Sequence, residues 1–202
     1  MKTLDIADES LRRTVKRVAA LNLGYFAVEF TVALVIGSVA LFSDSVDFLE
    51  DASINFLIAI ALGWSVQKRA RVGMGMAAII LVPAVAALWT AWQKFNAPVA
   101  PPPIPLMITG LGALIVNFKC AHMLVRFRNA SGSLTKAAFL SARNDAYANL
   151  AIILAGVATM FVVSAWPDLI VGLGIVLLNA GAAYEVWEAA RQESRADLDI
   201  KP

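Results

Sequence analysis

Six apolar stretches, each about as long as a helix that crosses a membrane, follow one another along the 202-residue chain. The hydrocarbon core of a bilayer is about 30 Å thick, and an α-helix needs roughly 20 apolar residues to cross it. Hydrophobic residues make up 59% of the sequence, whereas soluble domains have about 45–50%. We therefore expect spans at approximately residues 15–38, 40–65, 74–94, 104–125, 137–165 and 168–190.

Because a bilayer offers no water to unpaired backbone groups, spans rich in Ala, Val, Leu and Ile must be helical. We expect an all-α, polytopic membrane protein with one transmembrane domain over residues 1–202. Too little chain follows residue 190 for a C-terminal soluble domain. The N-terminal segment mixes acidic and basic residues and shows no small-residue cleavage site, so we expect no cleavable signal peptide.

The lysines and arginines predict the orientation of the chain. With six spans, four basic clusters fall on one side, and the other side holds only Lys94, in the loop after the third span. The positive-inside rule then places both termini in the cytoplasm, and we expect location in a bacterial inner (plasma) membrane. A net charge of +2 gives no broad basic surface for nucleic acid. The clusters are Arg12–Arg17, Lys68–Arg71, Arg126–Lys136 and Arg191–Lys201.

The second span carries four acidic residues at membrane depth, where an ionisable group is costly and usually marks a pathway or a site. At about 100° per residue, Asp44, Asp47 and Asp51 share one face of a helix, and Glu50 lies further round. Like charges this close in a low dielectric call for a bound metal ion or for protons. Asp44 and Glu50 have an equal alternative as interfacial residues at the wet end of the span.

The fifth span carries Ser141, Asp145 and Asn149, spaced by four residues along one stripe. If the second and fifth spans are antiparallel neighbours, two registers are possible. One pairs Asp47 with Asn149 and Asp51 with Asp145, and the other pairs Asp47 with Asp145 and Asp51 with Ser141. Either register supplies oxygen ligands to a small divalent cation.

Glu29 lies at membrane depth in the first span. It is a candidate proton carrier or vestibule group, and equally a hydrogen-bonding residue between helices. Together with Ser141 and Asp44 it is a candidate for a fourth ligand or for the access path to the site.

Asn22 is followed seven residues later by Glu29, and Gly37–Asp51 reads Gly-Ser-Val-Ala-Leu-Phe-Ser-Asp-Ser-Val-Asp-Phe-Leu-Glu-Asp. This pattern resembles the first two helices of the cation diffusion facilitator family, whose second helix reads Gly-Ser-x-Ala-Leu-x-x-Asp-x-x-(His/Asp)-x-x-x-Asp. Asp145 likewise precedes an apolar helix that ends in Trp-Pro-Asp, as in that family. The resemblance covers essentially the whole chain, which lacks the family's usual cytoplasmic domain and is similar to its short branch.

The resemblance implies that Asp47, Asp51 and Asp145 are metal ligands. The family usually has a His four residues before Asp145, where this chain has Ser141, so the fourth ligand is Asn149, Ser141 or water. It also implies efflux of a divalent transition metal in exchange for protons, by alternating access. Zn²⁺ comes first, with Cd²⁺, Co²⁺, Ni²⁺, Fe²⁺ and Mn²⁺ behind it. The metal is the cargo and we expect no prosthetic group.

The resemblance further implies a homodimer that associates through transmembrane helices. Small residues along the sixth span permit such contacts, and equally permit packing within one subunit. One alternative function is proton-coupled export of organic cations, which needs aromatic walls at membrane depth. Another is a membrane scaffold that binds metal without transporting it. We do not expect an enzyme, because no Ser/His/Asp set, activated cysteine or phosphate-binding loop is present. The small residues are Gly172, Gly174, Gly181, Ala182 and Ala183.

Overall fold

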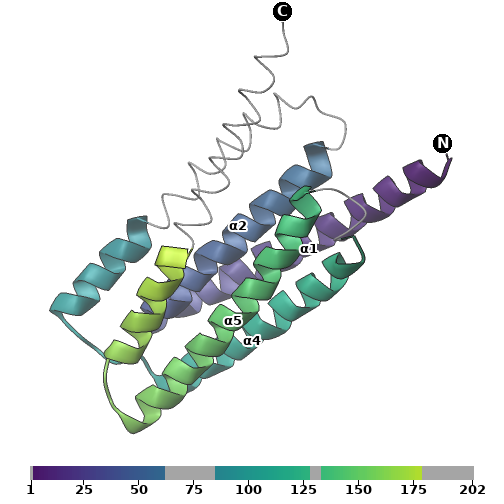
Figure 1. Cartoon of the computed structure of the whole chain (residues 1–202). Helices are drawn as coiled ribbons and strands as arrows, with labels where there is room; N and C mark the ends of the chain where they lie inside the picture. The colour runs from purple at the N-terminus through teal and green to yellow at the C-terminus, as the bar shows by residue number, and fades with distance from the viewer. Residues whose placement is uncertain (1, 62–84, 128–132, 179–202) are drawn as a thin grey trace, which may run out of the picture.

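The computed structural model of the chain describes residues 2–61, 85–127 and 133–178 (Figure 1). These residues form helices joined by short connections, and no strand occurs among them. The prediction of an all-α protein is therefore confirmed. The helices are α1 (Lys2–Ile36), α2 (Val39–Ala61), a helix over 85–96, α4 (Pro103–Leu124) with the 3₁₀ turn η1 (Val125–Phe127), α5 (Ser133–Phe161), and a helix over Trp166–Leu178.

Three of these helices are long and apolar enough to cross a bilayer, over Glu9–Ile36, Pro103–Phe127 and Ala142–Phe161. Helix α2 is 23 residues long, which is enough to cross a bilayer. It is not among the three because its four acidic residues make it less apolar. Much of the third and sixth predicted spans lies outside the described residues, as do two basic clusters, Lys68–Arg71 and Arg191–Lys201.

The predicted helix boundaries need two corrections. The span expected over residues 15–38 belongs to a longer helix that begins at Lys2 and ends at Ile36, because the polar N-terminal residues continue the same helix. The fifth predicted span lies four residues too far along the chain: α5 covers Ser133–Phe161, and the next helix begins at Trp166 rather than at residue 168. Pro167 suits a first helical turn, where its missing N–H would have no partner.

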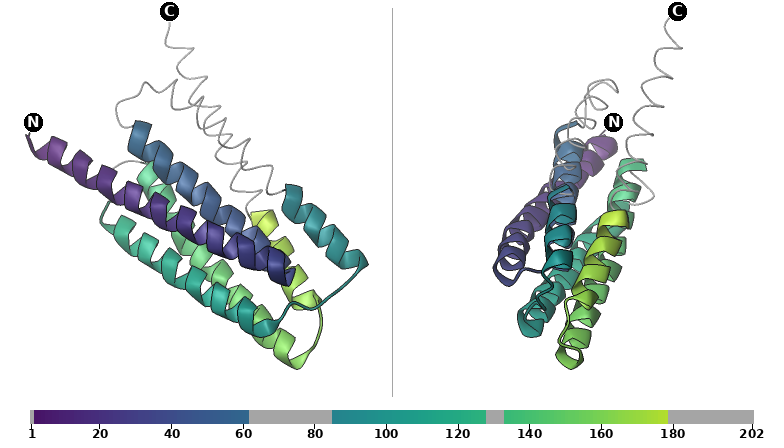
Figure 2. Two further views of the ribbon diagram at one scale, coloured as in Figure 1. Left: turned by 180° about the vertical axis from the view of Figure 1, so that it is seen from behind. Right: turned by 90° about the vertical axis from the view of Figure 1, so that its left-hand side faces the viewer.

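Helices α1, α2, α5 and α4 form a four-sided bundle in which each packs on two neighbours (Figures 1 and 2). Helix α1 contacts α2 and α4, and α5 contacts α4 and α2. The predicted neighbourhood of the second and fifth spans is therefore confirmed. The core has two main parts along the bundle axis, one around Val15 and Leu124 and the other around Leu41 and Ile152.

A buried ion pair holds one end of the bundle together. Asp168 accepts hydrogen bonds from the Ser38 hydroxyl (2.5 Å) and from the backbone N–H groups of Val39 (2.8 Å) and Ala40 (3.3 Å). It thereby supplies acceptors to the first amides of α2, which have no partner within the helix. Lys94 Nζ donates to Asp168 (2.8 Å) and to the carbonyl oxygen of Gly37 (2.6 Å).

The prediction that Lys94 lies in a loop is wrong. It occupies the helix over 85–96 and its side chain is only 7% exposed, because Asp168 and the Gly37 carbonyl draw its ammonium group inward. Gly37 adopts φ +66°, a left-handed conformation that glycine reaches without strain, and this allows the short turn between α1 and α2.

Candidate metal centre

The acidic residues of α2 face the inside of the four-helix bundle. Asp44, Asp47 and Asp51 are 0%, 7% and 2% exposed, whereas Glu50 is half-buried. This pattern matches the helical face predicted from their spacing. The alternative that Asp44 is an exposed interfacial residue is wrong, because the neighbouring helices enclose it completely.

A hydrogen-bond chain through Asn149 links α2, α5 and α4. The Asn149 amide donates to Asp44 Oδ2 at 2.6 Å, and its Oδ1 accepts a hydrogen bond from Asn117 at 3.1 Å. Asn149 and Asp44 are fully buried, and Asn117 is 2% exposed. Asn149 therefore lies at the level of Asp44, one helical turn away from the level at which the first register would place it.

This pairing indicates which of the two registers between α2 and α5 the chain adopts. Since the two helices are antiparallel, contact between Asp44 and Asn149 brings Asp145 to the level of Asp47. Asp145 is also the carboxyl group that acts most strongly on Asp47 electrostatically. Asp145 is half-buried, and it comes from the α5 stripe predicted to face α2. The arrangement is the second register, Asp47 beside Asp145.

The same register places position 141 level with Asp51. The backbone of Ser141 belongs to α5, but its side chain lies outside the described part of the structure. On the other side, Asn22 of α1 donates a long hydrogen bond of 3.4 Å to Asp51 Oδ2. Cys120 of α4 donates through its thiol to Asn22 Oδ1 at 3.4 Å. All four helices of the bundle thus contribute polar side chains around these acids.

Glu29 of α1 is fully buried, and its strongest charged neighbour is Asp44. Neither carboxylate oxygen of Glu29 receives a hydrogen bond from the residues that the structure describes, and Asp44 Oδ1 receives none from them either. Buried carboxyl oxygens without donors are costly unless a cation or a proton is close to them. A proton shared between the carboxyl groups of Glu29 and Asp44 would supply the hydrogen bond to a neighbouring helix that was the alternative role of Glu29.

The predicted ligands do not form a closed metal cage in this structure. Within the described ranges, no three His, Cys, Asp or Glu side chains gather closely enough to hold a metal ion. Asp47, Asp51 and Asp145 each have further interactions with their surroundings. The structure brings Asp47 and Asp145 to one level and Asp44 and Asn149 to the next.

Asn22 and Asn117 both make hydrogen bonds between helices. Their role beside the acidic residues was not predicted. The sequence did contain an indication of this role. An amide at membrane depth needs a polar partner, and the acidic residues of α2 are the nearest acceptors. Cys120 is a buried free cysteine whose thiol contacts Asn22.

The comparisons with known proteins identify the family of the chain. The chain matches the family model described as the cation efflux transmembrane domain over residues 15–192. A search of curated proteins gave no match. The matched region includes α1 from residue 15 onward, the whole of α2, α4 and α5, and every candidate ligand. The chain therefore belongs to the cation efflux family of membrane transporters, which is the cation diffusion facilitator family.

Proposed function

We propose that this cation efflux protein exports a divalent transition metal, with Zn²⁺ first among the candidates, and that Asp47, Asp51 and Asp145 bind it. The observation that carries the proposal is the Asn149–Asp44 hydrogen bond of 2.6 Å, since it holds α2 and α5 in the register that sets Asp145 beside Asp47. Carboxylates at one level of two adjacent helices are oxygen ligands for a divalent cation.

Asn149 is not a metal ligand in this scheme, although its spacing from Asp145 made it a candidate for one. Its amide and its carbonyl oxygen are both engaged, by Asp44 and by Asn117. We infer that Asn149 orients the bundle next to the metal, and that Ser141 or water supplies the fourth ligand beside Asp51. Glu29 and Asp44 then lie next to the metal-binding level, on the access path.

Proton exchange follows from the chemistry of the ligands. A metal ion and protons compete for the same carboxylate lone pairs, so binding of one releases the other. Rocking of helix pairs around the metal-binding level would expose it to each side of the membrane in turn.

A homodimer is part of the proposal. Ile170 and Leu177 are 65% and 72% exposed on the helix over Trp166–Leu178, and Gly174 between them has no atom within 4 Å of where a Cβ would lie. This small-residue face permits close approach of a second helix. Cysteine cross-linking at position 174 in membranes tests it; a monomer that never cross-links contradicts it.

The test of the transport proposal is metal flux into proteoliposomes that contain a metal-responsive dye. Zn²⁺, Cd²⁺ and Mn²⁺ are compared on wild type and on Asp47→Asn, Asp51→Asn and Asp145→Asn. We expect each substitution to reduce flux at least tenfold. Asn144→Ala is the matched control, because Asn144 precedes Asp145 on α5 but is exposed; it should keep wild-type flux.

Two other outcomes correspond to the alternative functions. Metal binding without flux would favour a scaffold. Export of organic cations, inhibited by the same substitutions while metals are not moved, would favour an organic-cation exporter. One observation favours the latter: the rings of Tyr25 and the buried Phe48 lie 5.0 Å apart at membrane depth, and Tyr25 is within electrostatic range of Asp44.

A further inference from the structure

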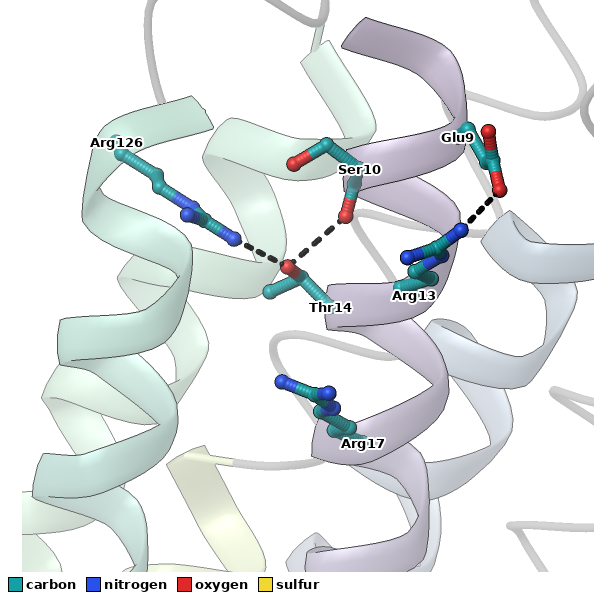
Figure 3. Close-up of a pocket in the computed structure, with 6 residues that line it drawn as sticks. All are labelled: Glu9, Ser10, Arg13, Thr14, Arg17 and Arg126. Carbon is teal, nitrogen blue, oxygen red and sulfur yellow. Dashed lines mark hydrogen bonds and ion pairs between the residues drawn. The ribbon is translucent and has the colours of Figure 1, made fainter. Parts of the chain in front are cut away.

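A basic pocket lies between α1 and the end of α4, away from the acidic centre. Its lining residues include three arginines and a single glutamate, and its volume is about 390 Å³ (Figure 3). Glu9 pairs with Arg13, so the positive charges of two other arginines remain uncompensated within the pocket. The pocket therefore suits an anionic group. The lining residues are Glu9, Ser10, Arg13, Thr14, Arg17 and Arg126.

One arginine is held in place before any ligand binds. Arg126 Nη2 donates to the Thr14 hydroxyl at 2.7 Å, and Thr14 in turn donates to the carbonyl oxygen of Ser10 at 3.0 Å. The Arg126 guanidinium also lies 4.5 Å from the centre of the Phe127 ring. A guanidinium has five N–H donors, so most of them stay available to an anion. Arg17 makes no hydrogen bond or ion pair with the side chains that the structure describes.

The pocket lies at the level of the lipid headgroups. The apolar part of α1 covers Glu9–Ile36, which at 1.5 Å per residue is about 42 Å, close to the thickness of a whole bilayer with its headgroups. Arg13 and Arg17 lie about 6 and 12 Å from its start, and Arg126 is at the end of the α4 span. Long basic side chains at these depths reach the interface.

An apolar groove continues from this pocket toward the membrane interior. It has a volume of about 450 Å³ and lies between α1 and α4, lined by Ala20, Leu21 and Met123, with Arg17 and Lys119 at its sides. Arg17 lines both the pocket and the groove, so the two are adjacent. The basic pocket suits the phosphate of a phospholipid, and the adjacent apolar groove suits one of its acyl chains.

We propose that this surface binds an anionic phospholipid, with its phosphate among Arg13, Arg17 and Arg126 and an acyl chain along Ala20, Leu21 and Met123. The basic residues favour an anionic over a zwitterionic headgroup by charge complementarity. The lipid would link α1 to α4, two helices that also carry Asn22 and Cys120 of the acidic centre. This inference does not depend on which metal is transported.

Native mass spectrometry of the full-length protein tests the proposal, after titration with phosphatidylglycerol or phosphatidylcholine of equal chain length. We expect phosphatidylglycerol to bind more tightly than phosphatidylcholine. Arg17→Gln and Arg126→Gln should each weaken the affinity for phosphatidylglycerol about fivefold. Lys16→Gln is the matched control, because it removes one charge from an exposed neighbour of Arg17 that does not line the pocket. Its affinity should stay within twofold of wild type.

The groove is tested separately by Ala20→Trp, which fills it, and by Leu23→Trp, which adds the same ring at a position 54% exposed on α1. Only Ala20→Trp should weaken lipid binding. Equal binding of the two lipids, or an equal loss in Lys16→Gln and Arg17→Gln, would overturn the proposal. Competition by inorganic phosphate as strong as that of the lipid would also overturn it, because the pocket would then be a site for a soluble anion.

Discussion

Substitution of Asp168 by Asn is expected to destabilise the protein strongly, because it removes the charge from a buried ion pair. Asp168 is completely buried and accepts hydrogen bonds from Ser38, Val39, Ala40 and Lys94. Asparagine keeps the size but loses the charge, and its NH₂ group would face N–H donors.

The magnitude follows from the burial of the pair. Without Asp168 the Lys94 ammonium, 7% exposed, would keep only the Gly37 carbonyl as a partner. Removal of one partner of a buried ion pair costs about 3–5 kcal/mol. In a chain of this size, that corresponds to a drop in Tm of roughly 10 °C.

Thermal unfolding of the purified protein in a mild detergent measures the effect. The double variant Asp168→Asn/Lys94→Met removes both charges of the pair and should recover at least about 2 kcal/mol of the loss. Glu9→Gln is the matched control, because it breaks an ion pair whose side chains are 63–70% exposed and should change stability by less than about 0.5 kcal/mol. If Asp168→Asn cost no more than Glu9→Gln, or if the double variant were no more stable than the single one, the reasoning would be refuted.

Three further predictions concern packing and the bundle interior. Gly172→Ala should cost about 1–3 kcal/mol, because its Cβ would lie 2.8 Å from the backbone of α2, while Gly174→Ala should be neutral; their Tm values decide this. Gly37→Ala should cost about 1–2 kcal/mol, since alanine is strained at φ +66°; an unchanged Tm would contradict this. Asn149→Leu should lower both Tm and metal flux by leaving Asp44 without its amide donor, whereas wild-type flux in this variant would show that Asn149 does not orient the centre.

The sequence was sufficient to predict the helical class and the buried acidic face of α2, because charge is tolerated at membrane depth only where helices enclose it. The choice between the two registers of α2 and α5 could not be predicted. Both registers place oxygen atoms opposite each other. The contact that distinguishes them is the hydrogen bond from Asn149 to Asp44, and Asn149 is itself held by a hydrogen bond from Asn117 of a third helix. Pairwise spacing contains no information about such a third partner.

The buried pair of Lys94 and Asp168 was also missed. The two residues are 74 positions apart, and each lies near a proline-rich or aromatic break that typifies a loop. They meet where three helix ends pack together, and Ser38 donates a further hydrogen bond to Asp168 there. The sequence near Pro167 can indicate where a helix begins, because that preference is local. The contact between Lys94 and Asp168 depends on the tertiary arrangement, which local sequence does not reveal.

The most direct test of metal–proton exchange at the acidic centre is simultaneous recording of a metal dye and a pH dye inside proteoliposomes. An acidic lumen is established with equal Zn²⁺ on both sides. Exchange at Asp47, Asp51 and Asp145 predicts Zn²⁺ accumulation together with proton loss from the lumen in wild type, and neither signal in Asp47→Asn. Zn²⁺ movement that ignores the proton gradient, or coupled movement that persists in Asp47→Asn, would contradict the account.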